Sequence, residues 1–81
     1  MNVDGVEVDF EPEGEQRLAV HADGRLIGHV VLVSDGRGLY AYRENGEAIQ
    51  RASPWGGRVT TRFATRELAV RALLEKLDAR D

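Results

Sequence analysis

Three glycine-ended dipeptides, each placed between segments rich in β-forming residues, constrain the fold more than any other feature of this sequence. They are Asp23-Gly24, Asp35-Gly36 and Asn45-Gly46. Such pairs favour the positive backbone φ angles of a two-residue type I′ turn, whose twist matches that of the two strands it joins. The sequence therefore predicts a series of antiparallel hairpins.

The segments between these turns predict the strands of a β-meander. Alternating or continuous apolar residues mark the strands at residues 6 to 10, 17 to 22, 25 to 33, 38 to 44, 47 to 51 and 59 to 63. After Thr65 the apolar period changes to that of a helix, which we expect to run from 65 to 79, with Thr65 as its N-cap and Glu67 in its first turn. One stripe of this helix is apolar and consists of Ala69, Val70, Leu73, Leu74 and Leu77.

These elements predict the fold class α+β: an antiparallel β-meander of about five to six strands packed on one C-terminal α-helix. We interpret residues 1 to 81 as one domain, with an acidic segment at 1 to 16, the meander at 17 to 63 and the helix at 65 to 79. The chain has 81 residues, 42% hydrophobic and 31% charged, which is an ordinary globular composition.

Charge is distributed unevenly along the chain. Residues 1 to 16 carry six acids and no base, whereas residues 17 to 71 carry nine arginines against five acids. The overall charge of −3 therefore conceals a basic body, which matters for the choice of partner.

Several classes of protein are not indicated by this sequence. It has no cysteine, no apolar run of the roughly 18 residues that a membrane span needs, and no signal-peptide pattern at its start. We therefore expect a cytoplasmic protein without disulfides.

No constellation of residues predicts catalysis or cofactor binding. His21 and His29 are expected on opposite faces of a hairpin, and Ser34 and Ser53 lie in predicted turns. We expect no enzyme activity, no metal site and no cofactor.

Strand alternation predicts a sheet with two apolar faces, of which one helix can cover only one. We assign the face with Leu18, Val20, Ile27, His29, Tyr40 and Tyr42 to the helix. The second face then has an apolar centre with a basic rim, and its candidate binding residues are Leu26, Val30, Leu32, Leu39, Arg17 and Arg43. Such a centre needs a cover. The cover is either the protein's own N-terminal strand or 52 to 57 loop, or another chain, as in a two-fold dimer.

Trp55 lies in this loop, next to Pro54 and two glycines. The preferred interpretation is a lid on the edge of the core, and the alternative is an anchor for binding a partner.

A resemblance is carried by residues 36 to 74, through Tyr40-Ala41-x-Arg43, Gly46, Phe63-Ala64-Thr65-Arg66-Glu67 and Ala72-Leu73. This pattern is similar to AP2-like domains and to the amino-terminal arm-binding domains of phage integrases. The resemblance implies three antiparallel strands followed by a helix, with the uncovered sheet face bound in the major groove of DNA. By this analogy Arg25, Arg43 and Arg62 are the candidate DNA contacts.

The sequence thus leads to a non-enzymatic binding module that self-associates as a homodimer or docks a partner protein through its second apolar sheet face. The alternative is an accessory DNA-binding domain of phage or mobile-element type that uses the same face. A third hypothesis is a small-molecule pocket between sheet and helix, near His29 and Tyr42.

Overall fold

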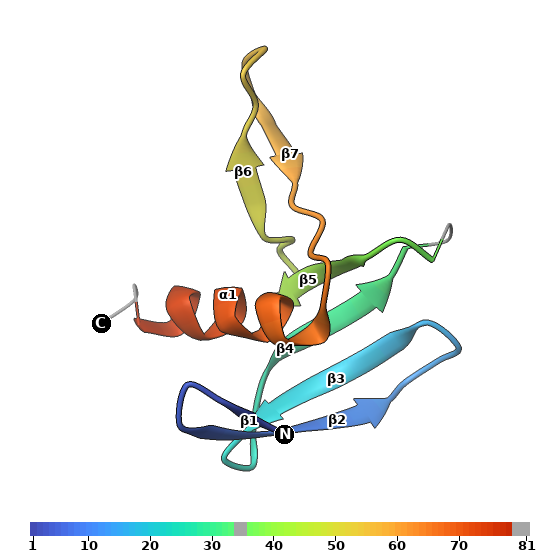
Figure 1. Cartoon of the computed structure of the whole chain (residues 1–81), viewed down its shortest axis with the longest axis vertical. Coiled ribbons are helices and arrows are strands. Elements are labelled where there is room, and N and C mark those ends of the chain that lie inside the picture. Colours follow the sequence, from blue (N-terminus) through green and yellow to red (C-terminus); the bar gives the residue numbers. More distant parts are fainter. Residues whose placement is uncertain (34–35, 79–81) are drawn as a thin grey trace.

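The structure is a computed structural model that describes residues 1–33 and 36–78. Its main body is an antiparallel sheet with a helix lying across one side, and a separate two-stranded hairpin stands away from this body (Figure 1). The elements are β1 (Asn2–Val3), β2 (Val6–Pro12), β3 (Arg17–Ala22), β4 (Arg25–Leu32), β5 (Leu39–Arg43), β6 (Gln50–Ala52), β7 (Arg58–Thr60) and α1 (Arg66–Asp78). The main sheet has the order β1-β2-β3-β4-β5, which confirms the predicted α+β meander packed on a C-terminal helix.

Two hairpins of the main sheet turn at Asp-Gly pairs. Asp23 and Gly24 have φ angles of 51° and 82°, as a type I′ turn requires, so this predicted turn is confirmed. Asp4 and Gly5 have φ angles of 52° and 85° and join β1 to β2 in the same way. This fourth pair was not among the predicted turns, although it carries the same sequence signal as the other three.

The Asn45-Gly46 turn is of a different type from the one predicted. The N–H of Gly46 donates to the carbonyl of Arg43 at 2.9 Å, and the N–H of Arg43 donates to the carbonyl of Glu47 at 2.7 Å. Only Gly46 of the central pair has a positive φ, of 91°, so the loop has three residues with glycine in the left-handed position. The remaining predicted turn includes Asp35, which lies outside the described residues.

A β-bulge in the β3–β4 hairpin reverses the predicted assignment of sheet faces. His21 pairs with Leu26, but Val20 pairs with Gly28, so Ile27 is an extra residue on β4. One extra residue moves every following side chain to the opposite face. The predicted helix-facing set was therefore wrong from Gly28 onward: Val30 and Ala41 lie beneath α1, and His29 and Tyr42 lie on the other side.

The core lies between α1 and this corrected sheet face. Ala69, Val70 and Leu73 of the predicted apolar stripe are fully buried, and Leu74 and Leu77 are partly buried against them. From the sheet, the buried core residues include Val8, Val20, Val30, Leu39 and Ala41. The predicted Thr65 cap is confirmed, because its Oγ1 accepts a hydrogen bond from the N–H of Leu68 at 3.2 Å.

The last two predicted strands do not extend the main sheet. Ala48 forms a single bridge to Tyr42, after which the chain leaves the body as β6 and returns as β7. The predicted strand at 59 to 63 is accordingly split: Arg58–Thr60 pairs with β6, whereas Phe63 exchanges hydrogen bonds of 2.8 and 2.9 Å with Leu39. Ile49 is buried at the junction between hairpin and body.

Candidate functional site

The six residues predicted to form a second sheet face do not share one surface. Val30 and Leu39 are 1% and 5% exposed beneath the helix, so they are core residues and are unavailable to a partner. By strand alternation Leu32 and Arg43 lie on this same helix-facing side, near the strand ends. Leu26 and Arg17 lie on the opposite side, with His21 and Val31 as their strand partners. The bulge at Ile27 is the cause of this separation.

The sheet does have an open face on the side away from α1, and of the six predicted residues only Arg17 and Leu26 lie on it. The open face consists of Arg17, Ala19, His21, Leu26, His29, Val31, Tyr40 and Tyr42. Asp9 and Glu11 of β2 continue it beyond β3. Leu26, Val31 and the two tyrosines are half-buried on this face. Because they lie among arginine, histidine and acidic side chains, the open face is mixed in polarity.

A polar group centres on His29 of the open face. The Nε2 of His29 lies 2.8 Å from Oε1 of Glu13, and the same carboxylate oxygen lies 3.6 Å from Nε of Arg17. A shallow hollow of about 390 Å³ adjoins this group and is lined by Arg17, His29, Val31, Tyr42, Glu44 and Gly46. His29 and Tyr42 are thus neighbours, as the third hypothesis required, but their hollow lies on the open face and not between sheet and helix.

The three arginines suggested by the DNA-binding resemblance are not brought together. Arg25 begins β4 next to the Asp23-Gly24 turn. Arg43 ends β5 and pairs with Glu47 at 3.3 Å, and Arg62 lies in the segment between β7 and α1, with its side chain against Gly38. The open face itself carries acids on β2, so it is not a basic surface.

The most distinctive surface is the hairpin of β6 and β7, residues 50–60, which we call the arm. Its turn is encoded locally: Pro54 fixes the backbone at the second turn position, and Gly56 adopts a φ of 100°. The N–H of Gly56 donates to the carbonyl of Ser53 at 3.1 Å, and the N–H of Ser53 donates to the carbonyl of Gly57, also at 3.1 Å. Trp55 is therefore presented at the tip.

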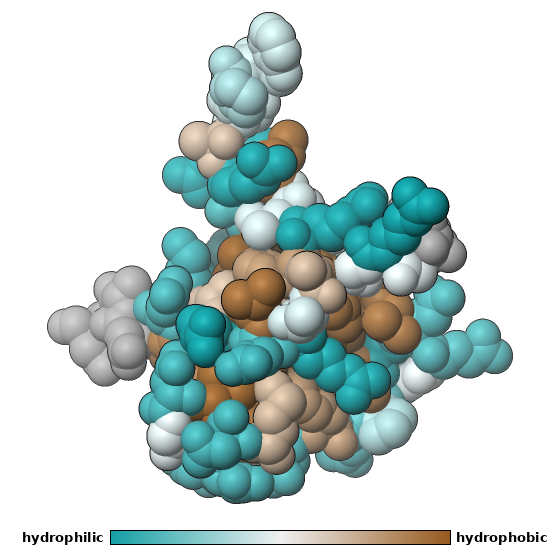
Figure 2. All heavy atoms as spheres, viewed as in Figure 1, coloured by the Kyte–Doolittle hydropathy of each residue, from teal (hydrophilic) through white to brown (hydrophobic). Residues whose placement is uncertain are grey.

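The arm makes almost no contribution to the core. Ser53 and Thr60 are half-buried and its other residues are exposed. Trp55 is 94% exposed, so the preferred interpretation of this residue as a lid on the core was wrong. Figure 2 shows the arm standing clear of the body, with few hydrophobic side chains along its length.

The charges of the arm are all positive. Between Glu47 and Glu67 the sequence contains Arg51, Arg58, Arg62 and Arg66 and no acid. Within the arm, Gln50 pairs with Thr60, Arg51 with Val59 and Ala52 with Arg58. Because side chains alternate along a strand, Arg51 and Arg58 lie on opposite faces of the ribbon.

The acidic segment lies at the other end of the molecule. β1 and β2 form one edge of the sheet, whereas the arm extends from beyond β5 at the opposite edge (Figure 1). All six acids of residues 1 to 16 are exposed. Negative and positive charge are therefore separated in the molecule, with a negative β1–β2 end and a positive arm.

Residues 1–33 and 36–78 contain neither a metal-binding cluster nor a membrane-spanning helix. Within these ranges no three His, Asp or Glu side chains are grouped closely enough to hold a metal ion. The helix described there is too short and too polar to cross a membrane. Comparison with protein-family models, with curated proteins and with solved structures gives no match, so the surfaces themselves carry the functional argument.

Proposed function

We propose that this protein is a non-enzymatic DNA-binding module that places its arm in the major groove of duplex DNA. The observation that carries the proposal is the construction of the arm: a projecting ribbon with no buried side chain, an arginine on each face and a fully exposed tryptophan at its tip. An isolated two-stranded hairpin is only marginally stable in water, so a partner that packs around it has a clear stabilising role.

The composition of the arm favours nucleic acid over a protein partner. A hairpin that docks on a protein is expected to present a continuous apolar strip, because the fully buried centre of a protein interface is more apolar than the rest of the surface. Here the ribbon carries Gln50, Arg51, Arg58 and Thr60, with Val59 as its largest apolar side chain outside the tip. Guanidinium, amide and hydroxyl groups are the groups that contact phosphates and base edges.

The distribution of arginine favours duplex over single-stranded DNA. A groove has two phosphate walls, and a ribbon with Arg51 on one face and Arg58 on the other has a cation for each wall. The major groove, about 12 Å wide, admits a two-stranded β-ribbon. A single strand has one backbone to contact, so cations on one face would be sufficient for it.

The position of the acids removes an electrostatic objection to this proposal. An overall charge of −3 opposes binding to phosphate, but three of the six N-terminal acids, Glu7, Asp9 and Glu11, lie on β2, three strands away from β5 and the arm. Two others are paired with cationic or basic side chains of the body, Asp4 with Arg71 and Glu13 with Arg17 and His29. Charges separated by more than about 10 Å are largely screened at 0.1 M salt. The arm therefore presents its positive charge to DNA without interference from the acidic end.

Three substitutions test the proposal by anisotropy of a labelled mixed-sequence duplex at two salt concentrations. Wild-type protein should bind more tightly at the lower salt concentration. Trp55→Ala should weaken binding about tenfold, or about 1.4 kcal/mol. Arg51→Ala should weaken binding and reduce the slope of log K against log salt by about 1. Arg25→Ala makes the same charge change away from the arm and serves as the control.

Two results would contradict DNA binding through the arm, and a third would contradict insertion into the groove. One is wild-type protein that binds no duplex even at low salt. The other is an effect of Arg25→Ala as large as that of Arg51→Ala, which would mean that overall charge and not the arm sets affinity. Tighter binding to a single-stranded oligonucleotide than to the duplex would contradict insertion into the groove.

The open face supports a second candidate function, self-association through two-fold packing of one sheet on another. Half-buried Val31, Tyr40 and Tyr42 are suited to an interface, where tyrosine is enriched. Arg17 on β3 and Asp9 on β2 make the face complementary in charge to a second copy of itself. Sedimentation velocity should then show a concentration-dependent dimer that Val31→Asp dissociates, whereas a monomer at all concentrations would exclude it.

A further inference from the structure

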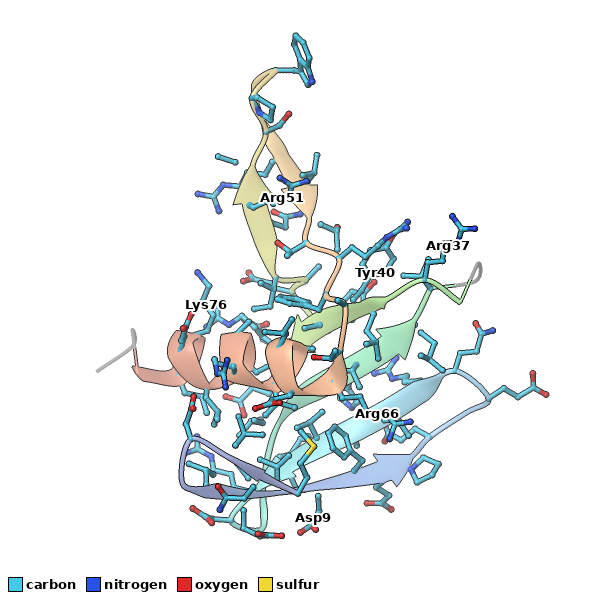
Figure 3. The ribbon with its side chains drawn as sticks, viewed as in Figure 1. Asp9, Arg37, Tyr40, Arg51, Arg66 and Lys76 are labelled. Carbon is cyan, nitrogen blue, oxygen red and sulfur yellow. The ribbon has the colours of Figure 1, made fainter. Side chains whose placement is uncertain are left out.

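A cleft at the base of the arm extends the arm's positive surface onto the body. It measures about 420 Å³ and is lined by Arg43, Glu47, Ala48, Ile49, Gln50, Arg58 and Lys76. These residues come from β5, from the segment leading into the arm, from both arm strands and from the last turns of α1. The cleft is therefore formed where the arm leaves the body, and in Figure 3 Lys76 lies on the side of α1 nearest the arm. We call it the basic cleft.

The charges of the basic cleft are unbalanced. Among the described residues that line it Glu47 is the one acid, and the Oε2 of Glu47 lies 3.3 Å from Nη1 of Arg43, so these two groups neutralise each other. Arg58 and Lys76 have no ion pair with any other described residue, and they face the same space from two different elements. The four charged residues described in the lining, three cations and one acid, carry a net charge of +2, as expected for a site that receives an anion.

The register of the arm connects this cleft to the tip. Arg58 pairs with Ala52 and Gln50 pairs with Thr60, so these four residues share one face of the ribbon. Two of them, Gln50 and Arg58, also line the basic cleft. This face of the arm thus leads from Ala52 and Arg58, next to the turn that carries Trp55, to Gln50 and to Lys76 on the helix, whereas Arg51 lies on the opposite face.

We infer that the basic cleft is a binding site for backbone phosphate, in which Arg58 and Lys76 hold one strand of the duplex whose groove receives the arm. This inference rests on the proposed function and adds a second element, α1, to the DNA-binding surface. A contact from the helix fixes the angle at which the arm enters the groove, because phosphate contacts determine the register and orientation of a protein on DNA.

Lys76→Ala tests this inference separately from the function itself. We expect it to weaken duplex binding several-fold and to reduce the salt slope by about 1, because one phosphate contact is lost. The Trp55 fluorescence change on binding should persist, since the tip still reaches the groove. Lys76→Arg should restore both the affinity and the slope. Arg25→Ala again gives the effect of removing an unrelated exposed cation.

The possible results distinguish the inference from the function on which it rests. If wild-type protein binds no duplex, the proposed function fails. If the wild type binds and Lys76→Ala matches Arg25→Ala in both affinity and slope, the basic cleft is not a backbone site and the inference alone is overturned. The alternative ligand is free inorganic phosphate, which can be titrated while the NMR amide shifts of residues 47–50 are followed. If phosphate shifts these amides and Lys76→Ala has no effect on DNA binding, the cleft binds a free anion. That result would also overturn the inference.

Discussion

Gly28 shows how one residue determines which side chains of this sheet reach the core. A Cβ atom placed on Gly28 would collide with the carbonyl oxygen of Tyr42 and would lie 3.0 Å from Cδ2 of Leu73. The helix therefore approaches the sheet closely at a position where the sheet has no side chain. The extra residue Ile27 places this glycine beneath Leu73, and so the bulge and the close helix packing depend on each other.

Gly28→Ala should destabilise the protein by about 1–3 kcal/mol, the usual cost of adding atoms to a packed interior. Gly14→Ala is the matched control, because its Cβ would meet no atom within 4 Å and its φ is not in the left-handed region. Urea denaturation followed by circular dichroism measures both. Equal midpoints for the two variants would show that α1 does not pack on Gly28.

The bulge also explains why the sequence predicts the strands well and the faces badly. Strand positions follow from turn dipeptides and alternation, which are local signals, and Asp23-Gly24 behaves as such signals predict. The extra residue at Ile27 has only one local signal, the neighbouring Gly28 inside the strand, which marks a bulge or a close backbone approach without saying which. The bulge is favoured by packing against a helix more than 40 residues away in the sequence. An error of one residue there placed Val30 and Leu39 on the wrong side.

Among the elements, α1 and the arm differ in how their sequences specify them. The helix has a cap, an apolar stripe and a Glu67–Arg71 pair at 3.2 Å, and each of these was predictable from spacing alone. The arm has a well-defined turn but no apolar face, so its sequence specifies a hairpin without specifying anything in this chain on which it packs. For that reason Trp55 could not be placed from the sequence.

Thr65→Ala should destabilise the protein by about 1 kcal/mol, because the first turn of α1 loses the hydrogen bond from Leu68 N–H. Thr65→Ser keeps the hydroxyl and should recover most of this free energy. Thermal unfolding of the two variants gives the comparison. A Thr65→Ala protein as stable as the wild type would mean that packing alone positions the start of the helix.

The arm should be removable without loss of the fold. Gln50 and Thr60 are opposite each other, so an Asn-Gly pair in place of residues 51–59 closes the ribbon with a two-residue turn. We expect a cooperative unfolding transition close to that of the wild type and complete loss of duplex binding. An unfolded product would show that the arm is part of the folding unit, and retained binding would place the DNA site elsewhere.

The whole molecule is organised along a charge axis, with exposed acids on the β1–β2 end and cations on the arm and the basic cleft. Its longest dimension is 38 Å, and Figure 1 shows β2 and the arm at opposite ends of that direction. The sequence already contained this asymmetry as an acidic segment before a basic body. Its spatial meaning required the strand order, because β2 pairs with β3 and so lies far from β5.

Neutralising part of the acidic end should leave DNA binding almost unchanged. Glu7→Gln combined with Glu11→Gln removes two negative charges at the edge of the sheet, several Debye lengths from the tip of the arm at 0.1 M salt. Affinity and salt slope should both stay within about twofold of the wild type. A large increase in affinity would indicate that the acids lie close to bound DNA, which is incompatible with the arm as the contacting element.

Fluorescence of the single tryptophan tests the central claim most directly, because Trp55 reports on the tip of the arm without any substitution. The free protein should show the emission and the acrylamide quenching of an indole in water. Addition of duplex DNA at low salt should change the emission and protect Trp55 from acrylamide, and added salt should reverse both effects. DNA that binds while Trp55 remains fully accessible to acrylamide would contradict insertion of the arm.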